Sequence, residues 1–330
     1  MVASALAPAP LLDVRDLHVA YAAEPAPIAA VDGVSFAIAP GEVVCLVGES
    51  GSGKTTLALS LAGLLPESAR RARGSIRWRG EDLAELPESS LQRIRGAQIG
   101  FVFQEPGIAL HPLLRVGDQI AHVLRAHAPL DRARSLAEAE RLIAEVGLRD
   151  PARTARAYPH ELSGGQQQRV TIAQAIACRP ALIVADEPTA SLDTTTRAEI
   201  LALLLDLNRR LGVALLLVTH DLATVATLGG RALVMYAGRV VEDAPFDRLA
   251  RLPLHPYTQA LLACRPRSRD EAADRRLPTI GGAPPDLARL SPGCAFEPRC
   301  PDRLSVCRER QPPAVEPEPG HLVRCFKHGE

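Results

Sequence analysis

The chain has 330 residues, 47% of them hydrophobic, and carries 38 basic and 38 acidic residues for a formal net charge of zero. Its length suits one large domain with an appendage, or two domains. This charge balance does not indicate the strongly basic face of a nucleic-acid-binding protein. No apolar run reaches the ~18 residues that a membrane-spanning helix needs. We therefore expect a soluble protein with no nucleic acid as partner, and not a membrane pore.

The first part of the chain is predicted to contain a tail followed by strands. Residues 1–10 lack the basic region and long apolar core of a signal peptide, so we expect a loose tail. Strands are predicted over 11–19 and 34–38. The run Val43–Val47 is apolar and is followed by glycine, which is typical of a strand buried on both faces of a parallel sheet.

The octapeptide Gly48–Thr55 fits the pattern G-x-x-x-x-G-K-[ST], and a helical pattern over 56–62 follows it. Glycines let the backbone approach phosphate groups, whose charge is met by N–H groups at the start of the helix. Lys54 is predicted to lie against the β- and γ-phosphates of ATP, and the Thr55 hydroxyl to bind Mg²⁺. The residues predicted to bind ATP here are Gly48, Ser50, Gly51, Ser52, Gly53, Lys54, Thr55 and Thr56.

Strands are predicted over 76–78 and 99–103, and the pattern from about residue 105 to 158 is helical. An arginine-rich stretch, Arg70–Arg73, precedes them, and we interpret it as a solvated loop rather than a binding patch. Within 133–147, apolar residues recur at helical spacing, and Gly147 is predicted to end that helix. These apolar residues are Leu136, Ala139, Leu142, Ile143 and Val146.

Two later apolar runs end in polar residues that suit phosphate chemistry. Leu182–Ala185 reads as a buried strand, and Asp186 follows it at the carboxyl end, where open α/β sheets place their ligands. Asp186 is predicted to hold Mg²⁺ through water, and Glu187 to polarise the water that attacks the γ-phosphate. A third strand, Ala214–Val218, leads to His220, which we interpret as a γ-phosphate contact that keeps Glu187 oriented.

Four of the seven cysteines are concentrated near the C-terminus: Cys294, Cys300, Cys307 and Cys325. Disulfides do not suit the reducing cytoplasm, which is where we expect a chain without a signal peptide to work. The spacing lacks the C-x₂-C pair typical of structural zinc, and an irregular set of four thiolates suits an iron–sulfur cluster better. An iron–sulfur cluster, zinc and no metal remain as alternatives.

The segment Leu162–Gln166, with the sequence Leu-Ser-Gly-Gly-Gln, is a glycine-rich turn with a serine placed to cap a helix. With this motif, the chain resembles the nucleotide-binding subunits of ABC transporters over residues 11–245. Gln104 matches the family's Q-loop, Ser191–Asp193 its D-loop and His220 its H-loop. Tyr21 lies where such proteins stack an aromatic ring on adenine.

The resemblance implies an α/β fold of the P-loop NTPase type, with a RecA-like core, an antiparallel β subdomain and an inserted helical subdomain over about 105–165. A Pro/Cys-rich C-terminal extension follows. The implied division is a tail over 1–10, an ABC ATPase domain over 11–250 and the extension over 251–330.

The resemblance also implies two composite ATP sites at a head-to-tail dimer interface. The implied catalytic residues are Glu187, His220 and Gln104. Mg²⁺ would be held through Thr55, Gln104 and Asp186. The neighbouring chain would contribute Ser163, Gly164, Gly165, Gln166 and Asp193.

Three segments, Val234–Arg239, His255–Thr258 and Pro292–Cys300, narrow the resemblance to the dipeptide and oligopeptide importer ATPases, a group that also includes ATPases for nickel. This implies an ATP-hydrolysing subunit of a bacterial importer, peripheral on the cytoplasmic face of the inner membrane. Implied partners are two transmembrane permease subunits, a second ATPase (a sister chain or a second copy) and an extracytoplasmic solute-binding protein.

Similar cysteines in some of these relatives hold a [4Fe–4S] centre, and the resemblance extends it to the four cysteines here. The chain departs from the group's pattern at Ile108–Pro112 and at Gln167, where an arginine is usual. The first departure lies near the expected docking site of the membrane partner. Uptake of nickel or another solute, and a non-transport role in DNA repair or at the ribosome, are the alternative functions.

Overall fold

The computed structural model describes residues 9–264 and 279–329, which form two compact units. The first unit comprises residues up to 13, 37–43 and 76–218, and the second comprises 14–36, 44–75 and 219 onward. Most of the predicted tail, residues 1–8, lies outside the described ranges.

The first unit is built on parallel strands in the order β8-β7-β6. Their bounds are β6 Ile99–Val102, β7 Leu182–Asp186 and β8 Ala214–Thr219. Every residue of β7 is buried, as expected of a strand covered on both faces. Val102 pairs with Ala185, and Asp186 with Val218, so the carboxyl ends of these strands meet at one edge of the sheet.

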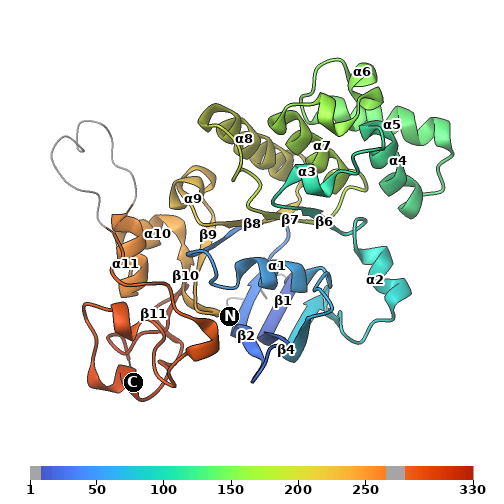
Figure 1. Ribbon diagram of the computed structural model, residues 1–330. Coiled ribbons are helices and arrows are strands. Elements are labelled where there is room, and N and C mark those ends of the chain that lie inside the picture. Colours follow the sequence, from blue (N-terminus) through green and yellow to red (C-terminus); the bar gives the residue numbers. More distant parts are fainter. Residues whose placement is uncertain (1–8, 265–278, 330) are drawn as a thin grey trace, which may run out of the picture. The chain divides into compact units, whose positions relative to one another are not determined.

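Helices dominate the rest of this unit (Figure 1). They are α2 Glu88–Ile94, α3 Pro106–Ala109, α4 Val116–His127, α5 Arg132–Glu145, α6 Pro151–Arg156, α7 Gly164–Ile176 and α8 Thr194–Leu211, with the 3₁₀ turn η1 Pro159–Glu161 and the short strand β5 Glu81–Asp82. The predicted helical stripe is confirmed, because Ala139, Leu142 and Ile143 are buried in α5. Gly147, at φ 76°, takes the left-handed conformation common just after a helix.

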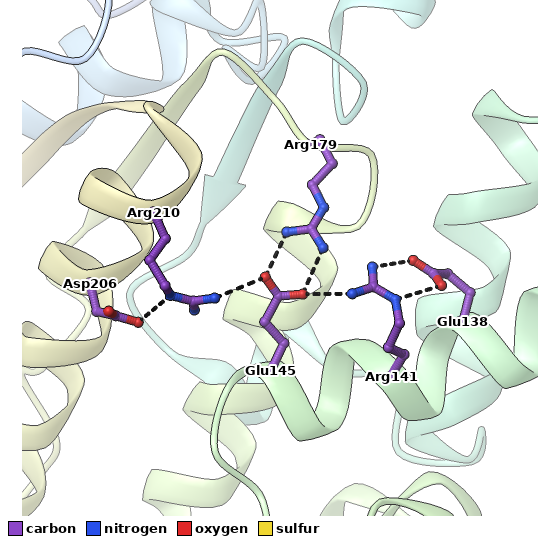
Figure 2. Close-up of polar contacts among 6 residues, drawn as sticks. All are labelled: Glu138, Arg141, Glu145, Arg179, Asp206 and Arg210. Atoms are coloured by element: carbon purple, nitrogen blue, oxygen red, sulfur yellow. Dashed lines mark hydrogen bonds and ion pairs between the residues drawn. The ribbon is translucent and has the colours of Figure 1, made fainter.

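A buried carboxylate joins α5 to its neighbours in the first unit. Glu145, whose side chain is 9% exposed, accepts hydrogen bonds from Arg179 at 2.6 and 2.7 Å (Figure 2). It also pairs with Arg141 at 3.3 Å and with Arg210 of α8 at 3.7 Å. The hydrogen bonds from Arg179 are the largest cause of the lowered pKa of Glu145. This network fixes the inserted helices to α8 and to the turn after α7.

The second unit contains strands in the order β11-β12-β10-β9-β3. They are β3 Val43–Val47, β9 Arg231–Tyr236, β10 Arg239–Pro245, β11 Val315–Glu318 and β12 His321–Val323. β3 lies parallel to β9, and the other pairs are antiparallel. The C-terminal segment therefore adds two strands to this sheet, which the weak hydrophobic pattern after residue 265 did not predict.

Three longer strands lie mostly in the second unit: β1 Leu12–Tyr21, β2 Ile28–Ile38 and β4 Ala69–Trp78. They form a sheet of order β2-β1-β4-β5. The interpretation of Arg70–Arg73 as a loop is wrong, because these residues belong to β4, although Arg70 and Arg73 are exposed. A side chain at Gly74 would overlap the Asp16 carbonyl, so this glycine permits β4 to approach β1 rather than ending the segment.

The helices of the second unit are short. They are α1 Lys54–Leu61, α9 Leu222–Leu228, α10 Phe246–Arg251 and α11 Pro256–Ala263, with the 3₁₀ turns η2 Leu287–Arg289, η3 Glu297–Arg299 and η4 Ser305–Arg308. Across the described parts of both units, no helix combines the length and apolar character required to cross a membrane.

Candidate functional site

The phosphate loop of the second unit connects β3 to α1, which begins at Lys54. Gly53 caps the helix with φ 97°, a conformation that residues with a side chain rarely adopt. A Cβ at Gly48 would overlap the Met235 carbonyl, and one at Gly53 would overlap the Ala30 carbonyl. Both end glycines of the motif are therefore required by close contact with neighbouring backbone.

Lys54 places its charge inside this loop. Its side chain is buried, and its Nζ donates to the carbonyls of Gly48 and Glu49, both at 2.8 Å, and to Ser52 Oγ at 3.3 Å. The ammonium group is thus held by the loop that the sequence predicts to surround the phosphates. A buried cation beside helix-start N–H groups suits a phosphate anion.

Tyr21 lies next to the helix that follows the phosphate loop. Its hydroxyl is 3.1 Å from the Thr56 hydroxyl, within hydrogen-bond distance. The structure therefore brings together two residues that the sequence assigned separately to ATP binding.

The carboxylates of the first unit stand at the end of β7. Asp186, the last residue of the strand, is 3% exposed, and Glu187 follows it with φ 43°. A left-handed backbone is uncommon for glutamate and is found where a local constraint selects it. The Glu187 amide donates to the Val218 carbonyl at 2.9 Å, which holds this turn against β8.

Gln104 lies two residues beyond β6, whose carboxyl end is next to that of β7. Adjacent strands are about 4.8 Å apart, so Gln104 belongs to the same edge of the sheet as Asp186. Its side chain is exposed. The structure thus confirms only their placement on one edge, and their roles as Mg²⁺ ligands remain predictions.

The signature segment begins α7 with a capping box. Ser163 Oγ accepts from the Gln166 amide at 3.4 Å, and Gln166 Oε1 accepts from the Ser163 amide at 2.9 Å. A Cβ at Gly165 would lie 2.5 Å from Thr196 Cγ2, whereas one at Gly164 would meet only Leu192, at an ordinary 3.7 Å. Packing thus requires glycine at 165 but not at 164.

Asp193 caps α8, which begins at Thr194. Its carboxylate accepts from the amides of Thr195 and Thr196 at 3.0 Å and from the Thr196 hydroxyl at 2.7 Å. The hydroxyl bond is the largest cause of the lowered pKa of Asp193. Thr196 therefore links Asp193 to Gly165, a connection that sequence reasoning missed because it depends on how α8 packs on α7.

His220 is exposed in the turn between β8 and α9. The following Asp221 caps α9, accepting from the Ala223 amide at 2.8 Å, and its own amide donates to the Thr219 hydroxyl at 3.0 Å. His220, Tyr21 and the phosphate loop belong to the second unit, whereas the carboxylates, Gln104 and the signature belong to the first.

The four C-terminal cysteines, Cys294, Cys300, Cys307 and Cys325, line one small cavity of about 20 Å³. Burial raises the pKa of Cys294 to about 11 and also raises those of Cys300 and Cys325. In the described ranges, no group of three or more His, Cys, Asp or Glu side chains is arranged to hold a metal ion.

A phosphate loop between β3 and α1, with a buried lysine inside it, defines a P-loop nucleotide-binding fold. Residues 31–190 match the ABC transporter family, and residues 241–307 match the C-terminal region of oligopeptide/dipeptide transporters. A probable peptide ABC transporter ATP-binding protein of Sinorhizobium fredii is 43% identical over 97% of this chain and 96% of its own length. The chain therefore belongs to the ABC transporter family of ATP-binding proteins.

Two further comparisons extend this result. The oligopeptide transport ATP-binding protein OppD of Mycobacterium tuberculosis is 47% identical over 96% of this chain, which spans about half (52%) of that relative's length. The dimeric, post-hydrolysis structure of the ATP-binding cassette MJ0796 with ADP and Pi matches with a TM-score of 0.64 and 31% identity. It covers 71% of this chain and 98% of its own. The predicted ABC ATPase fold is thereby confirmed.

Proposed function

We propose that the chain is the ATP-binding, ATP-hydrolysing subunit of a bacterial ABC importer that energises uptake of dipeptides and oligopeptides. The observation that carries the proposal is the joint presence of a phosphate loop holding Lys54 and a C-terminal region of the oligopeptide/dipeptide transporter type at 241–307. The first supplies the ATP chemistry, and the second favours peptides as the cargo.

The predicted site residues have three roles in phosphoryl transfer: they bind the nucleotide, neutralise phosphate charge and activate water. Lys54 and the amides of the phosphate loop bind the β- and γ-phosphates, and Tyr21 stacks on adenine. Glu187 accepts the proton of the attacking water, and His220 contacts the γ-phosphate and orients Glu187. Thr55, Asp186 and Gln104 would hold Mg²⁺, which would neutralise phosphate charge.

The signature would complete the ATP site of a second ATPase subunit, either a sister chain or a second copy. Ser163, Gly164 and Gln166 are exposed at the start of α7, and Gly165 follows the same turn. A Cβ at Gly164 would have only an ordinary 3.7 Å contact with Leu192, so the packing of this chain leaves the residue open for contact with a second subunit. A backbone N–H at a helix start is well suited to contact the γ-phosphate of a neighbour's ATP.

The membrane partner would dock beside Gln104. Phe103, Ile108 and Leu113 are 43%, 80% and 78% exposed. Exposed apolar side chains that gather in one segment indicate a protein-contact surface. We propose that this segment contacts one of two transmembrane permease subunits, and that the chain lies peripherally on the cytoplasmic face of the inner membrane. An extracytoplasmic solute-binding protein would deliver the peptide.

The four C-terminal cysteines would hold a [4Fe–4S] cluster. Their common cavity supports this, because four thiols supply the donor set that such a cluster needs. Binding would require loss of the thiol protons and closer approach of the four sulfurs. Zinc would be the alternative occupant.

The test is uptake of labelled dipeptides, oligopeptides and nickel in source cells that lack the gene and carry either the wild-type chain or the Glu187→Gln variant. We expect the variant to abolish peptide uptake alone. Loss of nickel uptake alone would show that nickel, not peptide, is the transported solute. Unchanged uptake of dipeptides, oligopeptides and nickel would contradict a role as importer of these solutes. The last result would favour a role outside transport.

A further inference from the structure

The C-terminal extension contacts the phosphate loop at Glu49. The Glu49 amide donates to the Tyr257 hydroxyl at 2.8 Å. Its carboxylate receives two hydrogen bonds from Arg299, at 2.7 and 3.0 Å. Glu49 is the second residue of the phosphate loop, whereas Tyr257 and Arg299 are more than 200 positions away in the sequence. The loop is therefore held from outside by both its backbone and its side chain.

The Arg299 side chain is well fixed. It is 5% exposed, and its Nε donates to the Gly281 carbonyl at 2.8 Å. Its guanidinium lies 5.9 Å from the centre of the Tyr236 ring. A bidentate guanidinium–carboxylate pair away from water is among the stronger polar contacts and is directional. Arg299 therefore determines where the Glu49 carboxylate lies.

The position of Arg299 is set by the segment that separates two of the clustered cysteines. Arg299 ends η3 and directly precedes Cys300, and Cys294 lies just before the same turn. The ring of Phe296 packs against those of Tyr236 and Tyr257, with ring centres 5.2 and 5.4 Å apart. The segment from Cys294 to Cys300 thus supplies both the cation that holds Glu49 and an aromatic ring that supports Tyr257.

A carboxylate in a phosphate-binding loop repels the polyanion that the loop must bind. Lys54 Nζ donates to the Glu49 carbonyl at 2.8 Å. Glu49 therefore belongs to the part of the loop that surrounds the lysine ammonium group, where the phosphates are expected to bind. Arg299 neutralises this carboxylate and holds it in one orientation. Without Arg299, the negative charge of Glu49 would act directly on the triphosphate.

We propose that Arg299 and Tyr257 are positioning residues for ATP: they hold Glu49, and ATP affinity therefore depends on the conformation of the Cys294–Cys300 segment. The inference rests on the proposed function only in that the loop binds ATP.

The experiment measures the dissociation constant of a fluorescent ATP analogue for the anaerobically purified, full-length chain. Arg299→Gln is expected to weaken binding roughly tenfold, within the range of direct side-chain couplings. Adding Glu49→Gln in the same chain removes the unpaired charge, so the double variant is expected to recover to within about threefold of wild type. Arg308→Gln is the matched control, because it breaks an exposed ion pair with Glu297 in the same segment.

Recovery of ATP affinity in the double variant would show that Arg299 acts by neutralising the charge of Glu49. If Arg299 only supported the fold, replacing Glu49 as well would not restore the affinity. Wild-type affinity in Arg299→Gln, or no recovery in a folded double variant, would overturn the proposal. If Arg299→Gln fails to fold, the Tyr257→Phe variant tests the proposal instead, since it removes one hydroxyl and is expected to weaken ATP binding about threefold. Unchanged ATP affinity in Tyr257→Phe would then overturn the proposal. A wild-type chain that does not bind ATP would instead contradict the proposed function.

Discussion

The Glu145 carboxylate accepts both of its short hydrogen bonds from Arg179, at 2.6 and 2.7 Å, although the residues are 34 positions apart. Arg141 and Arg210 complete its surroundings (Figure 2). The carboxylate therefore fixes the inserted helices to the elements that carry the signature. We expect this connection to support both stability and hydrolysis.

Glu145→Gln should lower the free energy of unfolding by about 1 kcal/mol at pH 7, because it removes the charge of a buried carboxylate whose arginine partners are partly exposed and screened by water. Arg179 holds the pKa of Glu145 below its ordinary value of 4.5. The ionised carboxylate therefore stabilises the fold above about pH 4.5, and this contribution is lost as pH falls through the folded-state pKa. Denaturant titrations of both proteins between pH 3 and 7 measure the difference.

Asp206→Asn is the control for that experiment, since Asp206 is 54% exposed and forms only an i,i+4 pair with Arg210. Its substitution should change stability by less than about 0.5 kcal/mol. A Glu145→Gln difference that stays constant down to pH 3 would contradict the assignment.

Gly164→Ala should leave stability unchanged but reduce ATP hydrolysis roughly 100-fold, as expected when a preorganised contact to the reacting phosphate is lost. Its new Cβ would have an ordinary 3.7 Å contact with Leu192. Gly165→Ala, by contrast, would place a Cβ 2.5 Å from Thr196 and should cost about 2 kcal/mol of stability.

Thermal unfolding and steady-state hydrolysis of both glycine variants distinguish the two effects. If Gly164→Ala hydrolyses ATP as fast as wild type while remaining folded, Gly164 does not contact the nucleotide of a partner subunit.

Ile108→Asp combined with Leu113→Asp should abolish peptide uptake in cells while ATP hydrolysis by the purified chain stays within about twofold of wild type. These side chains are 80% and 78% exposed, so their replacement disturbs no core. Leu252→Asp, which alters an exposed leucine in a different part of the chain, is the control. Uptake at the wild-type rate in the double variant would place the permease contact elsewhere.

Cys300→Ser should lower the iron and acid-labile sulfide bound to anaerobically purified protein, because one of four thiolate donors is lost. Cys264→Ser is the matched control, since Cys264 ends α11 and is absent from the lining of the four-cysteine cavity. Elemental analysis and the visible absorption spectrum report the result. Wild-type protein that holds zinc, or no metal, would rule out the iron–sulfur assignment.

Local patterns predicted the phosphate-loop region well. Val43–Val47 is the strand β3, and the helix begins at Lys54, because a buried apolar run and a glycine loop leave few other conformations. The same local reasoning failed at Arg70–Arg73, because the position of β4 beside β1 in the sheet makes these residues part of a strand rather than a solvated loop.

The contacts that sequence reasoning missed are non-local. The Arg299–Glu49 pair joins residues 250 positions apart, and β12 pairs with β10, where Val323 lies opposite Glu242, 81 positions away in the sequence. Neither leaves a periodic signal, because each depends on a few specific atoms rather than on an apolar face. Thr196, which links Asp193 to Gly165, is a third case.

The most direct test of ATP-driven peptide import is accumulation of a labelled oligopeptide by membrane vesicles that contain the assembled transporter and are loaded with ATP. With Glu187→Gln in place of the wild-type chain, we predict normal ATP binding but no accumulation, because the attacking water lacks its base. Accumulation at the wild-type rate in that variant would contradict the account.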